Sequence, residues 1–385
     1  MLQIYTQIHM SNPFIFKGYI DSEHFCDRQK ELETMINCVK NNIDVTLIAQ
    51  RRMGKTGLIY RLMDEIKSQQ IDITLLYVDI FATRNLAELN KTLADTILQT
   101  FPEKTSLGKR FLSFIKGFRP TFGFDQITGL PEITFYYQNE ADKVHTLESQ
   151  LAFLEEQPVP VLLAIDEFQQ IREYPEQNIE AILRTILQQS HNITCIFCGS
   201  RKHMMVDIFS NPQRPFFSST QFIGLANIDS TVYTDYIVDW FHRAGRTITD
   251  DAVQMILRWT RLHTYYTQRL CHEVFSIANT NATTDDVKRA CLNILSGNES
   301  YFLQYRSLLS DGQWRFLIAL SKEEEVEKPY ATLFLKKYNI GASAVAHRNL
   351  ESLQEKDLVF CETTKERTYY AIADVFFMRW LAREY

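Results

Sequence analysis

The sequence lacks four features that would place the protein in a special class. Its 7 cysteines are odd in number and scattered, so they do not suggest the disulfide framework of a secreted domain. No apolar stretch approaches the roughly 18 residues of a membrane-spanning helix. Residues 1–5 also lack the basic and apolar regions of a signal peptide. The formal charge is −6, so no overall positive field draws the chain to nucleic acid or anionic lipid. We therefore expect a cytoplasmic protein of enzyme size without a membrane partner.

The most informative feature present is the segment 49–56, which reads Ala-Gln-Arg-Arg-Met-Gly-Lys-Thr. An apolar run at 45–48 precedes it, and a helix-like segment at 57–63 follows it. Strand, tight loop and helix in this order is the context of a phosphate-binding P-loop, in which backbone N–H groups and the helix N-terminus surround the phosphates. In such a loop Lys55 reaches the outer phosphates and the Thr56 hydroxyl ligates Mg²⁺. The nucleotide-binding residues predicted from this motif are Ala49, Gln50, Arg51, Arg52, Met53, Gly54, Lys55, Thr56 and Gly57.

Ala49 departs from the P-loop pattern G-x-x-x-x-G-K-[ST], because it stands where the pattern has its first glycine. If that position needs a positive φ, alanine costs roughly 1 kcal/mol. If the position is extended, alanine costs almost nothing. The sequence leaves both alternatives open.

A second motif lies about 110 residues further on, at 161–167, and reads Val-Leu-Leu-Ala-Ile-Asp-Glu. The apolar run is continuous rather than alternating, as in a strand buried on both faces of a parallel sheet. Asp166 at its end is predicted to hold the Mg²⁺ shell. Glu167 is predicted to be the general base that polarises the attacking water. The order and context of the two motifs predict an α/β P-loop nucleotide triphosphatase core.

Polar residues also end other expected strands. Ser200 and Arg201 follow the strand 193–198 and are candidate sensors of the γ-phosphate, although Arg201 is equally an ordinary cap or surface residue. Asp79 ends the strand 73–80 and supports the metal site or merely caps the strand. Cys195 and Cys198 form a C-x-x-C within an apolar run without a second pair, which favours a buried strand over a metal or redox site.

The domain organisation follows from the alternation of elements. Residues 1–228 form the expected P-loop core, with a β-hairpin inserted at about 118–136. The aromatic residues around this hairpin either pack on the body or present a surface to a partner; packing is the favoured interpretation. Residues 229–300 read as a helical lid. Residues 301–385 read as three helices and two short strands, a winged helix-turn-helix.

The expected recognition helix at 343–356 has Val345, Leu350 and Leu353 pointing inward. It exposes the polar residues Ser343, His347, Arg348, Ser352 and Lys356. This face fits a DNA groove, but residues 301–385 hold 12 Lys and Arg against 12 Asp and Glu, a net charge of zero. Because a dedicated DNA binder usually shows a basic stripe, protein contact or intramolecular regulation is favoured over DNA.

The chain resembles the STAND branch of AAA+-related ATPases, and within it the archaeal-type family that is also expanded in Bacteroides-like bacteria. The family's P-loop G-P-R-R-x-G-K-T corresponds to 49–56, and its hydrophobic-D-E-F/I-Q strand to 165–169. Its G-S after the fourth strand corresponds to Gly199 and Ser200, and its F-x-x-R-x-x-E-L box to 25–32. The resemblance implies that Asp27 and Arg28, in this box, lie beside the adenine. We also expect Asp27 to cap the helix that follows.

The lid motif of that family, G-x-P-x-Y, is altered. Residues 262–266 read Leu-His-Thr-Tyr-Tyr, so the glycine and the proline are both absent. Arg261 and His263 remain candidate phosphate contacts. Arg214, just before the fifth strand, is either an arginine finger for a neighbouring subunit or a surface arginine, the favoured interpretation.

The sequence thus predicts an ATP-binding, Mg²⁺-dependent ATPase that acts as a molecular switch. Its catalytic residues are Glu167, Lys55, Ser200 and Arg201, and its metal-holding residues are Thr56 and Asp166. A protein partner or a second copy of the chain is the expected reader of the switch. The alternatives are a DNA-binding ATPase and a nucleotide-binding scaffold with little turnover.

Overall fold

The structure is a computed structural model that describes residues 12–19, 21–118, 120–124 and 131–385. The described chain divides into two compact units. One comprises Gly18–Asn227, and the other comprises Ile228–Tyr385 together with the N-terminal segment up to Lys17. Each unit has its own core, and each is treated separately below.

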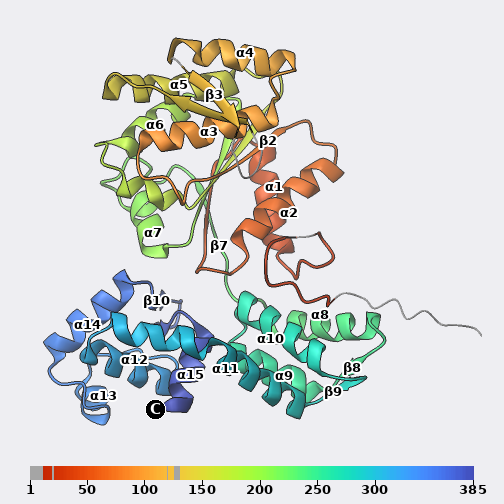
Figure 1. The fold of residues 1–385 in the computed structure, drawn as a ribbon, viewed down its shortest axis with the longest axis vertical. Helices are drawn as coiled ribbons and strands as arrows, with labels where there is room; N and C mark the ends of the chain where they lie inside the picture. Colours follow the sequence, from red (N-terminus) through yellow and green to blue (C-terminus); the bar gives the residue numbers. More distant parts are fainter. Residues whose placement is uncertain (1–11, 20, 119, 125–130) are drawn as a thin grey trace, which may run out of the picture. The chain divides into compact units, whose positions relative to one another are not determined.

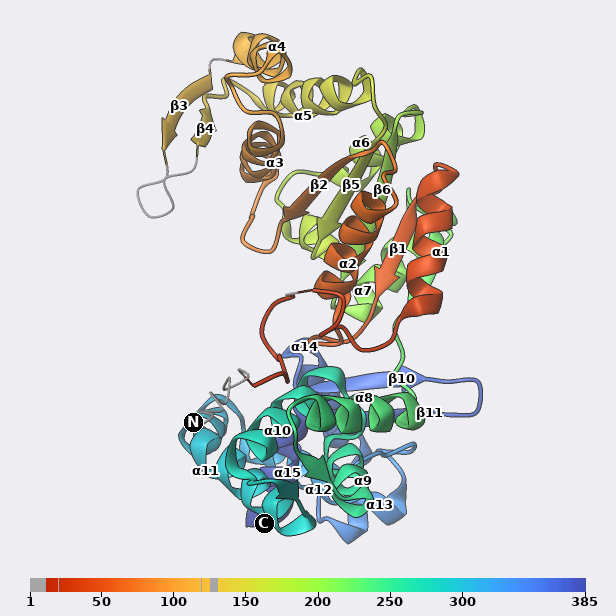
Figure 2. The same ribbon diagram turned by 90° about the vertical axis from the view of Figure 1, so that its right-hand side faces the viewer.

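The first unit is built on a five-stranded parallel sheet with the order β2-β5-β6-β1-β7 (Figure 2). The strands are β1 (Val45–Ile48), β2 (Thr74–Asp79), β5 (Val161–Asp166), β6 (Ile193–Gly199) and β7 (Gln221–Gly224). The three central strands β1, β5 and β6 are buried along their whole length, as their continuous apolar runs predict. The predicted α/β parallel-sheet core is confirmed.

Helices cover both faces of this sheet (Figure 2). On one face lie α1 (Gln29–Lys40) and α2 (Lys55–Ser68), which share a core with inward residues of the sheet such as Leu47 and Ala164. The other face is covered by α3 (Leu86–Thr100), α5 (Glu140–Glu155), α6 (Ile179–Gln188) and α7 (Lys202–Ser210), and α4 (Ser106–Ile115) packs on α5. Because neighbouring residues in a strand point to opposite faces, each central strand contributes to both cores.

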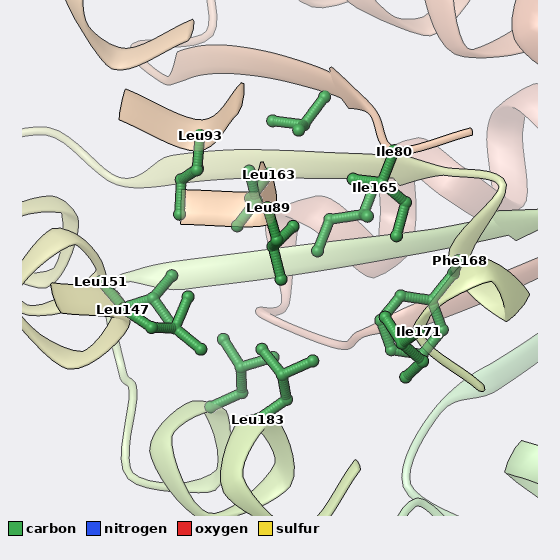
Figure 3. Close-up of a pocket in the computed structure, with 12 residues that line it drawn as sticks. Ile80, Leu89, Leu93, Leu147, Leu151, Leu163, Ile165, Phe168, Ile171 and Leu183 are labelled. Atoms are coloured by element: carbon green, nitrogen blue, oxygen red, sulfur yellow. The ribbon is translucent and has the colours of Figure 1, made fainter. Parts of the chain in front are cut away.

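Figure 3 shows an apolar gap of about 20 Å³ in the second of these cores. Its walls are aliphatic and aromatic side chains from β2, β5, η2 (Phe168–Glu173), α3, α5 and α6. A water molecule needs polar partners, and this lining offers none. The gap is therefore a dry packing defect and not a ligand site.

The helix α4 was not predicted from the sequence. Its N-cap Thr105 accepts a hydrogen bond from the Gly108 amide, and Phe111 and Ile115 are fully buried. Gly108 is required here, because a Cβ atom at this position would lie 2.2 Å from the carbonyl oxygen of Pro102. The helix ends in η1 (Lys116–Phe118).

The strands β3 (Pro120–Phe124) and β4 (Pro131–Phe135) pair antiparallel where the hairpin was expected. Three of the surrounding aromatic residues pack on the body: Phe111 and Phe135 are buried, and Phe114 packs edge-on against Phe153 at 5.7 Å. The turn expected at Thr128 and Gly129, and the side chains of Phe118, Phe122 and Phe124, lie outside the described residues.

The second unit is helical in its first half (Figure 1). It contains α8 (Ser230–Arg243), α9 (Asp250–Thr260), α10 (Thr264–Ile277) and α11 (Thr284–Leu308), with β8 (Thr247–Ile248) and β9 (Asn281–Ala282) forming a short parallel pair. The sequence predicted that the last of these helices ends near residue 295. It continues to Leu308 through Gly297, because Phe302 is buried against Phe377 and Trp380. Packing outweighs the low helix propensity of glycine.

The second half of this unit has the elements of a winged helix. They are α12 (Asp311–Glu323), α13 (Thr332–Lys337), α14 (Ser343–Glu355), β10 (Val359–Thr363), β11 (Thr368–Ile372) and α15 (Val375–Glu384). Leu350 and Leu353 of α14 are fully buried as predicted, but Val345 is 38% exposed and Ala346 takes the inward position.

The N-terminal segment was expected in the P-loop core, but residues 12–17 pack on the helical unit. The physical reason is Phe14, which is 1% exposed and contacts Phe241 and Phe275 with ring centroids 5.7 and 5.8 Å away. The Asn12 side chain also donates to the carbonyl oxygen of His272 at 2.7 Å. Among the described residues, no helix has the length and apolar character needed to cross a membrane.

Candidate functional site

The loop between β1 and α2 turns sharply into the helix. Gly54 has φ 93° and Arg52 has φ 63°, so the chain turns through the left-handed region just before α2. Ala49 is not among the described residues with positive φ, and its side chain is buried. The absent glycine therefore introduces no backbone strain, and the question left open by the sequence is answered for this position.

Lys55 lies at the first position of α2 and is 5% exposed. Its Nζ donates to the carbonyl oxygens of Ala49 and Gln50, both at 3.2 Å, so the side chain folds back over the loop. No side chain caps the N-terminus of α2. A helix N-terminus with an adjacent ammonium group is an arrangement that binds phosphate.

Asp166 at the end of β5 meets Thr56 across 110 residues of sequence. The Thr56 hydroxyl donates to Asp166 Oδ2 at 2.7 Å, and the Glu167 amide donates to Asp166 Oδ1 at 2.9 Å. A hydroxyl and a carboxylate are hard oxygen donors, as Mg²⁺ prefers. The described residues contain no group of three or more His, Cys, Asp or Glu able to enclose a metal by themselves. The pair therefore fits Mg²⁺ shared with a phosphate better than a metal cage made by the protein alone.

Glu167 follows Asp166 in a left-handed conformation, with φ 56°. Its Oε2 accepts hydrogen bonds from the Ser200 hydroxyl at 2.7 Å and from the Gln169 side-chain amide at 2.5 Å. Gly199 lets Gln169 come this close, because a Cβ at Gly199 would lie 2.4 Å from Gln169 Oε1. The Ser200 hydroxyl thus contacts Glu167, the candidate general base. Sequence reasoning assigned no role to Gln169.

Asp79 lies opposite Asp166 in the register of β2 and β5. Its carboxylate accepts a hydrogen bond from the Phe81 amide at 2.9 Å, which is a strand-capping contact. Desolvation raises the pKa of Asp79, and the charges of Asp166 and Glu167 raise it further. The pKa shift reports a concentration of negative charge at this edge of the sheet, where a cation would be attracted.

Comparisons with known proteins agree with this architecture. Residues 300–383 match the family model described as "Probable winged helix domain". A comparison with curated protein sequences gives no match. Among solved structures, the Walker-type ATPase of Pyrococcus abyssi is similar over 96% of this chain and 99% of its own, with a TM-score of 0.66 and 16% identity. The ORC2 protein of Aeropyrum pernix, in complexes with ADPNP and ADP, is similar over 97% of this chain and 96% of its own, with a TM-score of 0.56 and 16% identity.

The chain thus shares its fold with these two P-loop proteins, and its C-terminal part matches a winged helix domain. The order β2-β5-β6-β1-β7 brings the ends of the two motif-bearing strands to one edge of the parallel sheet. Thr56, Asp166, Glu167 and Ser200 meet at that edge through the hydrogen bonds described above.

Other predicted residues of the first unit have partners within the protein. Arg28 is 4% exposed, and its guanidinium donates to the Ala226 carbonyl oxygen at 2.7 Å and pairs with Glu31 at 3.2 Å. Asp27 and Arg28 both have positive φ, and α1 begins only at Gln29, so the prediction that Asp27 caps this helix is wrong. The box nevertheless borders the loop helix, because the Phe25 ring lies 3.1 Å from the place of a Cβ at Gly57.

The remaining loop residues differ in exposure. Met53 is buried, Gln50 is half-buried, and Arg51 and Arg52 are exposed. Arg201 pairs with Glu173 at 3.3 Å. Arg214 donates to Asp207 Oδ2 at 2.9 Å and pairs with Glu180 at 3.4 Å, all within this chain. These contacts favour a surface ion-pair role for Arg214.

The two lid candidates lie in the helical unit. Arg261 donates to the carbonyl oxygen of Glu324 at 3.3 Å and pairs with the Glu325 carboxylate. His263 is 7% exposed and lies against Tyr266 with ring centroids 4.6 Å apart. Both side chains contact their own unit in this structure.

The C-x-x-C pair lies in the buried strand β6, as predicted. Cys195 and Cys198 are 1% and 0% exposed, and burial raises the pKa of both thiols well above the ordinary value. Buried neutral thiols are poor nucleophiles and poor metal ligands.

Proposed function

We propose that the protein is a Mg²⁺-dependent ATPase that acts as a nucleotide-driven switch of the AAA+/STAND type. The observation that carries this proposal is the hydrogen bond between Thr56 and Asp166, which joins the two halves of a phosphate and metal site. Lys55, the uncapped N-terminus of α2 and Glu167 lie around that bond. The AAA+-type fold supports the same proposal.

In this proposal each group has a defined task. Lys55 and the amides of the loop bind the phosphates of ATP. Thr56 and Asp166 hold Mg²⁺, which when bound neutralises charge on the phosphates. Glu167 accepts a proton from the water that attacks the terminal phosphorus, and ADP leaves.

Ser200 and Gln169 hold Glu167 Oε2 in the present structure. Glu167 must keep a free lone pair to accept a proton, and both of these hydrogen bonds go to Oε2 and not to Oε1. Ser200 thus orients the base. A hydroxyl at this position is also suited to respond to the presence of the terminal phosphate. Hydrolysis removes the terminal phosphate, so contacts made to it would break, and this change would drive the switch.

The experiment that tests the proposal is ATP binding by the wild-type protein and by Lys55→Ala. The matched control is Lys67→Ala, which removes an exposed lysine from the last turn of the same helix. We expect Lys55→Ala to weaken ATP binding at least tenfold, because about 1.4 kcal/mol of phosphate interaction already gives that factor. Lys67→Ala should bind like the wild type. Equal affinity in all three proteins would contradict the proposed role of the loop.

A DNA-binding ATPase is the second candidate, supported by the winged-helix match and by the exposed side chains of Ser343, His347 and Arg348 on α14 and of Lys356 at its C-cap. The balanced charge of residues 301–385 disfavours it. Salt-dependent duplex binding that is lost in Arg348→Glu but kept in Arg315→Glu, on the exposed side of α12, would establish this function. No binding at low salt would remove it.

A nucleotide-binding scaffold is the third candidate. Micromolar ATP affinity without measurable phosphate release would identify it.

A further inference from the structure

Tyr77 on β2 contacts the carboxylate of Asp166, which also contacts Thr56 of the P-loop helix. The Tyr77 hydroxyl donates to Asp166 Oδ2 at 2.8 Å. Oδ2 is the same oxygen that accepts the Thr56 hydroxyl at 2.7 Å. Asp166 therefore has two hydroxyl donors on one oxygen and the Glu167 amide on the other.

The strand β2 explains why Tyr77 reaches this position. Leu76 and Val78 are buried in the core on the α3 side of the sheet, so the alternation of the strand turns Tyr77 to the α2 side. Tyr77 lies opposite Ala164 of β5, two residues before Asp166, and the small alanine leaves room for the ring.

The Tyr77 ring is itself held by neighbouring aromatic residues. Tyr60 on α2 contacts it with ring centroids 5.0 Å apart. Tyr19 stacks on Tyr60 at 6.2 Å, and the Tyr19 hydroxyl donates to Asp64 Oδ2 at 2.9 Å. Because Tyr60 follows Thr56 by one helical turn, α2 positions both Thr56 and the packing partner of Tyr77.

We propose that Tyr77 is a positioning residue for the magnesium site, which holds the Asp166 carboxylate in the orientation in which it meets the metal. This inference rests on the proposed ATPase function and extends it. The Thr56 hydroxyl would ligate Mg²⁺ through an oxygen lone pair while its O–H group still donates to Asp166 Oδ2. Tyr77 is a second donor to the same oxygen from a different element, so it fixes the direction of the carboxylate independently of the P-loop helix. Groups that hold a metal-binding side chain in place typically change metal affinity by about 10–100-fold when they are removed.

The test is Tyr77→Phe, which keeps the ring against Tyr60 and removes only the hydroxyl. The matched control is Tyr174→Phe, which removes another hydroxyl from a buried tyrosine, one that bonds to Thr83 away from Asp166. Binding of a fluorescent ATP analogue is measured in EDTA and across a Mg²⁺ titration, together with the thermal unfolding midpoint of each protein.

We expect Tyr77→Phe to raise the Mg²⁺ concentration for half-maximal enhancement of binding about tenfold. Its affinity for the analogue in EDTA should match the wild type. Tyr174→Phe should leave the Mg²⁺ requirement unchanged even if it lowers the unfolding midpoint. With Mn²⁺ in place of Mg²⁺, the bound metal can be measured directly by electron paramagnetic resonance. The Mn²⁺ concentration for half-maximal binding should again be about tenfold higher in Tyr77→Phe than in the wild type.

An unchanged Mg²⁺ requirement in Tyr77→Phe would overturn the inference while leaving the proposed function intact. An equal loss in Tyr77→Phe and Tyr174→Phe would assign Tyr77 a purely structural role and overturn it as well. Absence of nucleotide binding in the wild type would contradict the proposed function, and the inference would fall with it.

Discussion

At the scale of single residues, the site combines positions that the sequence identifies with positions that only the fold identifies. Two local motifs predicted Lys55, Thr56, Asp166 and Glu167. This was possible because each motif and the strand or helix next to it consist of residues that are neighbours in the sequence. Gln169 contacts Glu167, and the sequence identified it only as the last position of the motif at 165–169, without a role. Tyr77 contacts Asp166 and does not stand out in the sequence. Tyr77 could not be assigned because its contact depends on β2 lying next to β5, which the chain order does not specify.

Ala49→Gly tests the claim that the first P-loop position carries no strain. Ala49 lacks a positive φ and is buried, so glycine relieves nothing and adds freedom to the unfolded chain. We expect a loss of about 0.5–1 kcal/mol in the free energy of unfolding. ATP affinity should stay within about twofold, a difference of about 0.4 kcal/mol. Chemical denaturation and ATP titration of the two proteins provide the measurements. A large gain in ATP affinity would show that alanine does impair the loop.

At the scale of elements, the strands were predicted more accurately than the helices. Continuous apolar runs such as 161–165 and 193–198 have few alternatives to a buried parallel strand. Helices that depend on distant packing were harder to predict. The segment that forms α4 was assigned to an irregular region, and α11 was ended 13 residues too early because Gly297 and its neighbours are weak helix formers. In both helices the deciding contacts, such as Phe111 with Phe153 and Phe302 with Phe377, join residues far apart in sequence.

The amino end of the sheet depends on Asp44, the residue before β1. Its carboxylate accepts a hydrogen bond from the Cys195 amide of β6 at 2.7 Å, and its carbonyl oxygen accepts one from the Gln221 amide of β7. One residue thus links three strands. Desolvation raises the pKa of Asp44 from 3.8 to about 6, although the Cys195 hydrogen bond acts in the opposite direction.

This raised pKa predicts a pH dependence of stability. Between pH 3.8 and about 6 the folded protein keeps a proton on Asp44 that the unfolded chain has released. Folding is therefore favoured at the low end of this window, and stability is lost as the pH rises through the folded pKa. A shift of about two pKa units corresponds to about 3 kcal/mol. Asp44→Asn should lose this dependence, because the amide oxygen still accepts from Cys195 and does not ionise.

The measurement is urea unfolding of the wild type and Asp44→Asn at pH 4.5 and pH 7. Other titrating groups are common to both proteins, so the difference between the two pH responses isolates Asp44. Parallel pH responses would show that Asp44 is ionised in the folded protein throughout this range.

At the scale of the whole molecule, the chain passes between its two units twice. Residues 12–17 pack with the helical unit, the core follows from Gly18, and the chain returns at Ile228. The sequence indicated three successive regions but not this return of the N-terminus, because the burial of Phe14 depends on Phe241 and Phe275 more than 200 residues away. The two units are therefore joined by two covalent connections.

The central claim is that the site formed around Asp166 hydrolyses ATP with Glu167 as the base. The most direct test is the rate of phosphate release from ATP in the presence of Mg²⁺ by the wild type and by Glu167→Gln, with ATP affinity measured on the same samples. Glutamine can still accept from Ser200 and Gln169 but cannot take a proton from water. We predict turnover by the wild type and a loss of at least about 100-fold in Glu167→Gln, with ATP affinity retained. An unchanged rate of phosphate release in Glu167→Gln would contradict the account.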